Sequence, residues 1–117
     1  DDEPAVRATT RMLLEAIGHE VTVAEDGKSG LEHFLATLDS QPTELILLDL
    51  VLPDMHGNEV LAQLREQGHT VPVLVISGYS PTDCGPGADG FLRKPFTRQQ
   101  MARSITEVLG ARMTGDR

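Results

Sequence analysis

The sequence predicts a single α/β domain built as a doubly wound parallel sheet, and three observations support this fold class. Short apolar strands alternate with amphipathic helices along the 117 residues. The segments 45–49 (LILLD) and 71–77 (VPVLVIS) are apolar without polar alternation, as expected when helices cover both faces of a sheet. The length fits one domain, and its core must be aliphatic, because 39% of the residues are hydrophobic but only 3% are aromatic.

The expected elements follow one another in a regular order. The first helix spans 5–17, since Pro4 suits a first helical turn and Gly18 suits the C-terminal stop. Thr97 is the expected N-cap of the last helix. After the first helix, the periodicity predicts a strand at 20–24, a helix at 28–40, a strand at 45–49, a helix at 58–68 closed by Gly68, strands at 71–77 and 90–92, and the last helix at 97–110.

The charge and composition narrow the classes of function. The 18 acidic and 10 basic residues give a net charge of −8, which argues against sequence-independent binding to nucleic acid or to an anionic membrane. Cys84 is the only cysteine, so no internal disulfide forms, which suits a reducing, cytoplasmic location. No apolar run approaches the length of a membrane span, and no signal-peptide pattern is visible.

Polar residues occur where the strands of the predicted sheet end. Asp49 ends the most apolar strand, Ser77 ends the next, and Lys94 lies just beyond the last. Asp1 and Asp2 precede the first helix, where the carboxyl end of a first strand would lie. In parallel sheets these ends share one rim, at which ligands bind. Three carboxylates, one hydroxyl and one ammonium would therefore converge.

This set of side chains suits a hard cation and a phosphoryl group. Mg²⁺ prefers oxygen ligands and commonly takes only one or two carboxylates. The cation and Lys94 would let the carboxylates stay ionised together, and both could neutralise phosphoryl oxygens. The residues alone thus predict a magnesium-dependent phosphoryl site.

The segments DDEP, LLDLVLPDMHGNEV, ISGY and GFLRKPF, in this order, resemble the receiver domain of two-component response regulators over essentially residues 1–117. Each motif is weak alone, but their joint order at the ends of successive strands is specific. The resemblance implies a flavodoxin-like, CheY-like sheet of order 2-1-3-4-5. The ISGY and RKPF segments look most like receivers attached to hybrid sensor histidine kinases, with response regulators that carry a separate output domain as the second choice.

The resemblance also implies residue roles. Asp49 would accept a phosphoryl group from a histidine kinase or a histidine phosphotransfer domain, without turnover of the usual enzymatic kind. Mg²⁺ would be held by Asp1, Asp2, Asp49 and the backbone carbonyl of Val51. The further partners implied are an output domain outside this chain and a second copy of the chain.

Three other positions complete the implied site. Ser77 would hydrogen-bond the phosphoryl group, and Lys94 would pair with it. Phe91 takes the position of the aromatic switch, so that Ser77 and Phe91 together report phosphorylation. The bond before Pro95 is usually cis in the family, and cis peptide bonds are mostly confined to X-Pro pairs.

Simpler interpretations exist for each residue taken alone. Asp49 would be a strand-end carboxylate that caps a loop, and Asp1 and Asp2 an acidic N-cap of the first helix. Ser77 would be an ordinary turn residue and Lys94 a solvated charge. Phe91 reads more simply as a core aromatic. Two residues outside this set stay with the simple interpretation: Asp54 as a turn residue beside Gly57, and Cys84 as structural or incidental.

The sequence departs from the family pattern in two places. The apolar first strand of the family does not precede Asp1, so we expect the chain to be truncated at its N-terminus. The segment 77–94 is short and rich in glycine and proline, so we expect the fourth helix to be short or absent.

Residues beside the site predict a persistent acyl phosphate. Val51 and Tyr79 lie two positions beyond Asp49 and Ser77, where they would hinder an attacking water, and Gly78 leaves space beside Ser77. A competing hypothesis of another class is a receiver-like interaction module that takes no phosphate. A hydrolase of the aspartyl-phosphate class is disfavoured, because it would need a second acid where Val51 stands.

Overall fold

The computed structural model describes residues 4–16, 24, 26–40, 42–78, 84–85 and 87–115. Its sheet has three parallel strands in the order β1-β2-β3, namely β1 (Ile46–Asp49), β2 (Val73–Ser77) and β3 (Gly90–Arg93). This order matches the last three strands of the predicted 2-1-3-4-5 sheet. The strand expected at 20–24 lies outside the described residues apart from Ala24, which is not in a strand.

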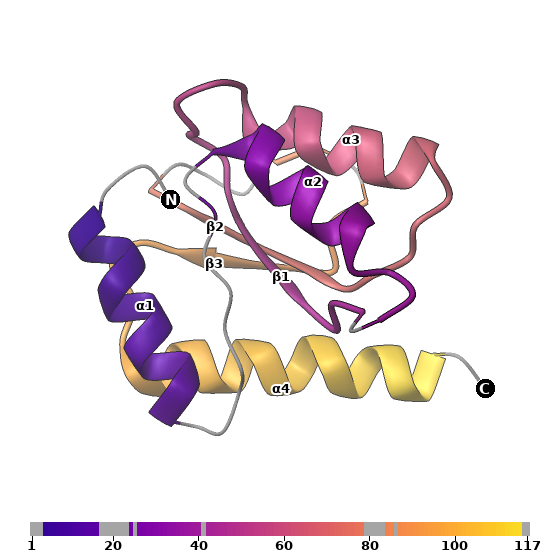
Figure 1. Cartoon of the computed structure of the whole chain (residues 1–117). Helices are drawn as coiled ribbons and strands as arrows, with labels where there is room; N and C mark the ends of the chain where they lie inside the picture. The colour runs from indigo at the N-terminus through magenta and orange to yellow at the C-terminus, as the bar shows by residue number, and fades with distance from the viewer. Residues whose placement is uncertain are drawn as a thin grey trace.

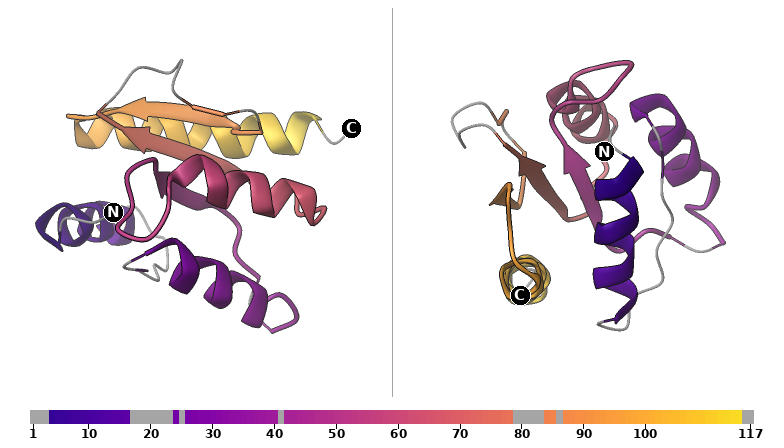
Figure 2. Two further views of the ribbon diagram at one scale, coloured as in Figure 1. Left: turned by 90° about the horizontal axis from the view of Figure 1, so that it is seen from above. Right: turned by 90° about the vertical axis from the view of Figure 1, so that its left-hand side faces the viewer.

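Helices cover both faces of the sheet, as the apolar strands predict. Helices α2 (Gly27–Ala36) and α3 (Gly57–Glu66) lie on one face, and α1 (Pro4–Ala16) and α4 (Arg98–Gly115) lie on the other (Figures 1 and 2). Strand β2 is fully buried and divides its side chains between two cores. Val73 and Val75 pack toward α2 and α3, whereas Leu74 and Ile76 pack toward α1 and α4.

The helix ends test the capping predictions. Thr97 caps α4 as expected: its hydroxyl accepts a hydrogen bond from the amide of Gln100 at 3.1 Å, and the Gln100 side chain accepts one from the Thr97 amide at 2.8 Å. This reciprocal pair is a capping box. The predicted end of α4 at Gly110 is wrong, because the helix continues to Gly115. A single glycine inside a helix costs only about 1 kcal/mol and does not force a stop.

Helix α2 is shorter than the predicted 28–40. It ends at Ala36, and residues 37–40 form a turn. The hydroxyl of Thr37 donates back to the carbonyl oxygen of His33 at 2.9 Å, and so provides a hydrogen-bond partner for one of the last carbonyl groups of the helix. Leu38 continues the apolar pattern of the helix in the sequence, which is why the predicted helix extends to residue 40. In the structure Leu38 lies beyond the end of α2 and is exposed.

The connection from β2 to β3 is anchored by one arginine at its far end. Arg65 of α3 donates from Nη1 to the carbonyl oxygens of His69 and Val71, both at 2.9 Å, and from Nε to that of Gly87 at 3.0 Å. Its Nη2 pairs with Asp89 at 3.0 Å. The described residues 84–85 and 87–89 of this connection are not helical. This agrees with the expectation that the helix between β2 and β3, the fourth of the family pattern, is short or absent; the helix labelled α4 is the one that follows β3.

Replacing Arg65 with alanine is expected to lower the free energy of unfolding by about 2–3 kcal/mol, because the part-buried carbonyl oxygens of His69 and Val71 lose a charged donor and the ion pair with Asp89 is lost. Urea denaturation measures this change. Arg11→Ala is the matched control, since the interaction of Arg11 with the described residues is an exposed ion pair with Glu15 at 3.6 Å. The control should lose about 0.5 kcal/mol or less. Equal losses in the two variants would contradict the anchoring role.

The described helices do not meet the requirements of a membrane span, which needs a long and apolar helix. None of them combines the necessary length with sufficient apolar character.

Candidate functional site

Asp49 lies at the carboxyl end of β1 and is only 6% exposed. Both oxygens of its carboxylate have partners: the amide of Val51 donates to Oδ1 at 2.8 Å, and the ammonium of Lys94 forms an ion pair with Oδ2. Burying a charge is costly unless it is paired and hydrogen-bonded. The structure meets both conditions, so Asp49 is held as an oriented, charge-compensated carboxylate.

The ends of β2 and β3 bring the other predicted residues to the same rim. Ser77 is buried at the end of β2, and its carbonyl oxygen accepts a hydrogen bond from the amide of Lys94 at 2.8 Å. Asp49 pairs in register with Ile76, the residue before Ser77. The Lys94–Pro95 peptide bond is cis. The structure thus brings Asp49, Ser77 and Lys94 together from three strands, as their positions in the sequence predict.

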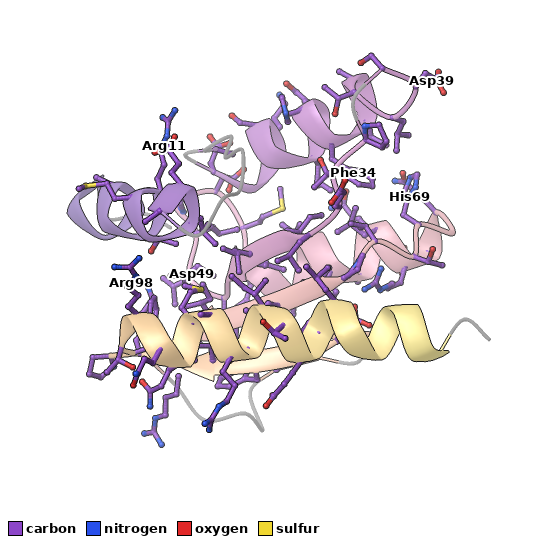
Figure 3. All side chains as sticks on the ribbon, turned by 90° about the horizontal axis from the view of Figure 1, so that it is seen from below. Arg11, Phe34, Asp39, Asp49, His69 and Arg98 are labelled. Atoms are coloured by element: carbon purple, nitrogen blue, oxygen red, sulfur yellow. The ribbon has the colours of Figure 1, made fainter. Side chains whose placement is uncertain are left out.

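Figure 3 shows where this rim lies in the molecule. Asp49 is near the end of the sheet at which α4 begins with Arg98. Phe34 and His69 lie toward the opposite end (Figure 3), where their rings pack edge to face with their centroids 5.0 Å apart. The polar cluster is therefore separated from the aromatic contact that joins α2 to the segment after α3.

The loop that follows Asp49 is closed by its own backbone. The amide of Gly57 donates to the carbonyl oxygen of Leu50 at 2.7 Å, and Val51 and His56 form an antiparallel bridge. The Nδ1 atom of His56 accepts a hydrogen bond from the amide of Asn58 at 3.1 Å and so caps α3. Histidine is not among the usual N-cap residues, so the sequence does not predict this role.

Asp54, at the tip of this loop, does more than the predicted turn residue. Its Oδ1 accepts a hydrogen bond from the amide of Gly27 at 2.8 Å, and its Oδ2 accepts one from the amide of Lys28 at 2.9 Å. These two backbone donors hold the pKa of Asp54 below its usual value. The interaction spans 27 residues, so no local sequence signal could have revealed it.

Phe91 and Val51 occupy different environments. Phe91 is half-buried on β3 and packs against the core cluster on the α2 and α3 side of the sheet, which agrees with the simpler interpretation as a core aromatic. Val51 is 42% exposed beside Asp49. Gly78 is exposed, and among the described residues no atom beyond its chain neighbours lies within 4 Å of the position that a Cβ would take there.

Several predicted residues lie outside the described part of the chain: Asp1, Asp2 and Tyr79. Among the described residues, no group of three or more histidine, cysteine or acidic side chains could hold a metal ion. The described donors that fit Mg²⁺ are the Asp49 carboxylate and the backbone carbonyl of Val51, both hard oxygen ligands. A complete magnesium site would need the aspartates at the N-terminus.

Cys84 is half-buried, and its thiol donates to the carbonyl oxygen of Gly85 at 3.4 Å. Burial raises the pKa of this thiol above its usual value. Because the thiolate is the reactive form of cysteine, little of it is present near neutral pH. This environment agrees with a structural or incidental residue.

Comparison with known families identifies the fold. Residues 1–106 match the family described as the response regulator receiver domain. The chain is similar to a solved response regulator receiver domain protein (CheY-like) from Methanospirillum hungatei, with a TM-score of 0.83 and 28% identity over 98% of this chain and 93% of that one. It is also similar to the response regulator TrrA of Thermotoga maritima in complex with Mg²⁺ and BeF (TM-score 0.83, 26% identity, 93% of this chain and 94% of that one). The predicted CheY-like α/β fold is confirmed.

Two curated relatives indicate the kind of protein that contains such a domain. The alkaline phosphatase synthesis transcriptional regulatory protein SphR of Synechococcus elongatus is 36% identical over 88% of this chain. The transcriptional regulatory protein TrcR of Mycobacterium tuberculosis is 31% identical over 93% of this chain. The chain spans 44% and 43% of the length of these relatives.

The expected origin in a hybrid sensor histidine kinase is not supported, because these relatives are transcriptional regulatory proteins. The curated relatives do not connect the ISGY and RKPF segments with a kinase parent protein. The fold, the order of the strands and the match over residues 1–106 agree with one another. The chain belongs to the response regulator receiver domain family of two-component signalling.

Proposed function

We propose that Asp49 is the phospho-acceptor of this receiver domain. The observation that carries the proposal is the buried carboxylate, which the Val51 amide and the Lys94 ammonium hold in one orientation. Preorganised positioning and charge neutralisation are the main requirements of phosphoryl transfer, which asks for little covalent work from the protein. An exposed or disordered aspartate would meet neither requirement.

The chemistry at Asp49 is an in-line displacement. A carboxylate oxygen attacks the phosphorus of a phosphohistidine on the donor protein, and an O–P bond forms while the P–N bond breaks. The electron pair of the broken bond stays with the imidazole of the donor. The product is an acyl phosphate, with Lys94 pairing with its phosphoryl oxygens and Ser77 hydrogen-bonding to one of them.

Asp49 and the carbonyl of Val51, together with Asp1 and Asp2, would hold Mg²⁺, which when bound neutralises phosphoryl charge. The chain contributes the nucleophile and its orientation. It thereby assists its own phosphorylation and dephosphorylation without acting as a turnover enzyme.

The partners follow from this role. The phosphoryl donor would be a histidine kinase or a histidine phosphotransfer domain in the cytoplasm. Because the named relatives are about twice as long as this chain and are transcriptional regulators, we propose that the receiver controls an output domain of the same parent protein. Ser77 and Phe91 would transmit the state of Asp49 to that domain, or to a second copy of the chain.

Incubation with Mg²⁺ and acetyl phosphate, followed by intact-mass measurement, tests this proposal. The expected result is the addition of one phosphoryl group. A folded protein that gains no phosphoryl group would favour the alternative of a receiver-like interaction module.

Replacing Val51 with asparagine is expected to shorten the lifetime of the acyl phosphate several-fold. The valine side chain is partly exposed beside Asp49, where it excludes water from the phosphoryl group, whereas an amide would bind water there. The decay of the phosphorylated species, followed by intact mass after removal of acetyl phosphate, measures the effect. Val51→Ile is the control and should leave the lifetime nearly unchanged. An unchanged lifetime in the asparagine variant would refute the shielding role.

A further inference from the structure

Asp54 joins two parts of the molecule that are distant in the sequence. Its two carboxylate oxygens accept hydrogen bonds from the first two amides of α2, those of Gly27 and Lys28. The first amides of a helix have no partner within the helix. Asp26 already caps the same helix locally, by accepting a hydrogen bond from the amide of Ser29 at 2.7 Å. Asp54 therefore adds to the cap a connection from α2 to the loop after β1.

The contact between this loop and α2 is close as well as polar. A Cβ atom at Gly27 would lie 2.8 Å from Cγ of Met55 and 2.9 Å from its sulfur. The start of α2 thus rests directly on the residue after Asp54. The loop is fixed to α2 at its tip by two hydrogen bonds and by packing.

The other end of the same loop reaches the acceptor carboxylate. Val51 donates its amide to Oδ1 of Asp49 and bridges to His56 across the loop. The Gly57–Leu50 hydrogen bond closes the base. Because these internal bonds make the loop one compact unit, a shift of its tip is transmitted to the amide of Val51. That amide and the Lys94 ammonium together orient the Asp49 carboxylate.

We propose that Asp54 is a positioning residue for phosphoryl transfer, which ties the loop of residues 50–57 to α2 and so keeps the Val51 amide on Asp49. This inference rests on the proposed role of Asp49 as acceptor. A displacement of about 1 Å at a reacting group can cost a factor of up to about 100 in rate. An aspartate carboxylate is ionised at neutral pH, and the two backbone donors lower the pKa of Asp54 further, so the connection persists there.

Asp54→Ala is compared with Asp26→Ala to test the proposal. Both variants remove a carboxylate from the start of α2, and both lose capping of that helix. Only the Asp54 variant releases the loop. Phosphorylation by acetyl phosphate should slow about tenfold in Asp54→Ala and stay within about twofold of the parent rate in Asp26→Ala. Asp54→Asn, which keeps one acceptor oxygen, should be intermediate.

A second readout is independent of phosphorylation and of metal. Hydrogen exchange of the Val51 amide, followed by NMR without Mg²⁺, should speed up several-fold in Asp54→Ala but not in Asp26→Ala. This measurement reports on the Val51–Asp49 hydrogen bond itself. A variant that only loses helix capping would not change it selectively.

The outcomes separate the two hypotheses. Equal slowing in Asp54→Ala and Asp26→Ala, or unchanged exchange of the Val51 amide in Asp54→Ala, would overturn the positioning role while Asp49 remains the acceptor. A parent protein that takes no phosphoryl group would overturn the proposed function, and the positioning role with it. If Asp54→Ala unfolds, Asp54→Asn provides the same comparison.

Discussion

Asp49→Asn is expected to take up no phosphoryl group under conditions in which the parent protein gains one. The amide that replaces the carboxylate carries no negative charge and is a poor nucleophile. Its oxygen can still accept from the Val51 amide, but its NH₂ group faces the Lys94 ammonium, which is also a donor. We therefore also expect a loss of about 1–3 kcal/mol in the free energy of unfolding. Intact mass measures the first effect and urea denaturation the second.

Asp39→Asn is the matched control for this prediction. Asp39 is exposed and lies far from Asp49, at the opposite end of the molecule (Figure 3). This variant should accept one phosphoryl group at the parent rate and unfold at the parent urea concentration. A phosphoryl group found on folded Asp49→Asn would show that another residue is the acceptor, and the proposed function would then have to be abandoned.

Gly57→Ala is expected to destabilise the protein by about 3 kcal/mol or more. A Cβ at this position would lie 2.7 Å from the Cα atom of Leu50 and 3.0 Å from the carbonyl carbon of Asp49, and closer still to the carbonyl oxygen of Asp49. These are backbone atoms of Asp49, the last residue of β1, and of Leu50, the residue after it, so no side-chain rotation can relieve the contact. The start of α3 must move away from β1, which breaks the hydrogen bond from Gly57 to Leu50.

The free energy of unfolding of Gly57→Ala, measured in urea, tests this prediction. Gly78→Ala is the control, because the residue is exposed and no described atom beyond its chain neighbours lies within 4 Å of the added Cβ. The control should change stability by about 0.5 kcal/mol or less. A Gly57→Ala protein as stable as the control would mean that α3 does not approach β1 as closely as described. Phosphorylation of the Gly57 variant should also slow, because the added methyl group contacts the backbone carbonyl group of Asp49 itself.

Local patterns in the sequence predicted the parts of the fold that depend on neighbouring residues. The apolar segments ending at Asp49 and Ser77 form parallel strands, β2 fully buried and β1 buried at its carboxyl end, and Thr97 caps the last helix as expected. Each of these features depends on residues within a few positions of one another, so the apolar period of a strand and the side chain that caps a helix can be recognised in the sequence. The end of α2 was misplaced because Leu38 continued the apolar period without reaching the core.

The sequence by itself determined the fold class and the rim at which Asp49, Ser77 and Lys94 meet, because a parallel sheet places the carboxyl ends of its strands together. Only the tertiary structure decided how that rim is supported. Asp54 reaches back 27 residues to α2, and Arg65 reaches 24 residues ahead to Asp89. A carboxylate can accept hydrogen bonds from many donors and a guanidinium can donate to many acceptors, and the packing of helices on the sheet selects the partners. That selection is a property of the closed chain and leaves no local pattern in the sequence.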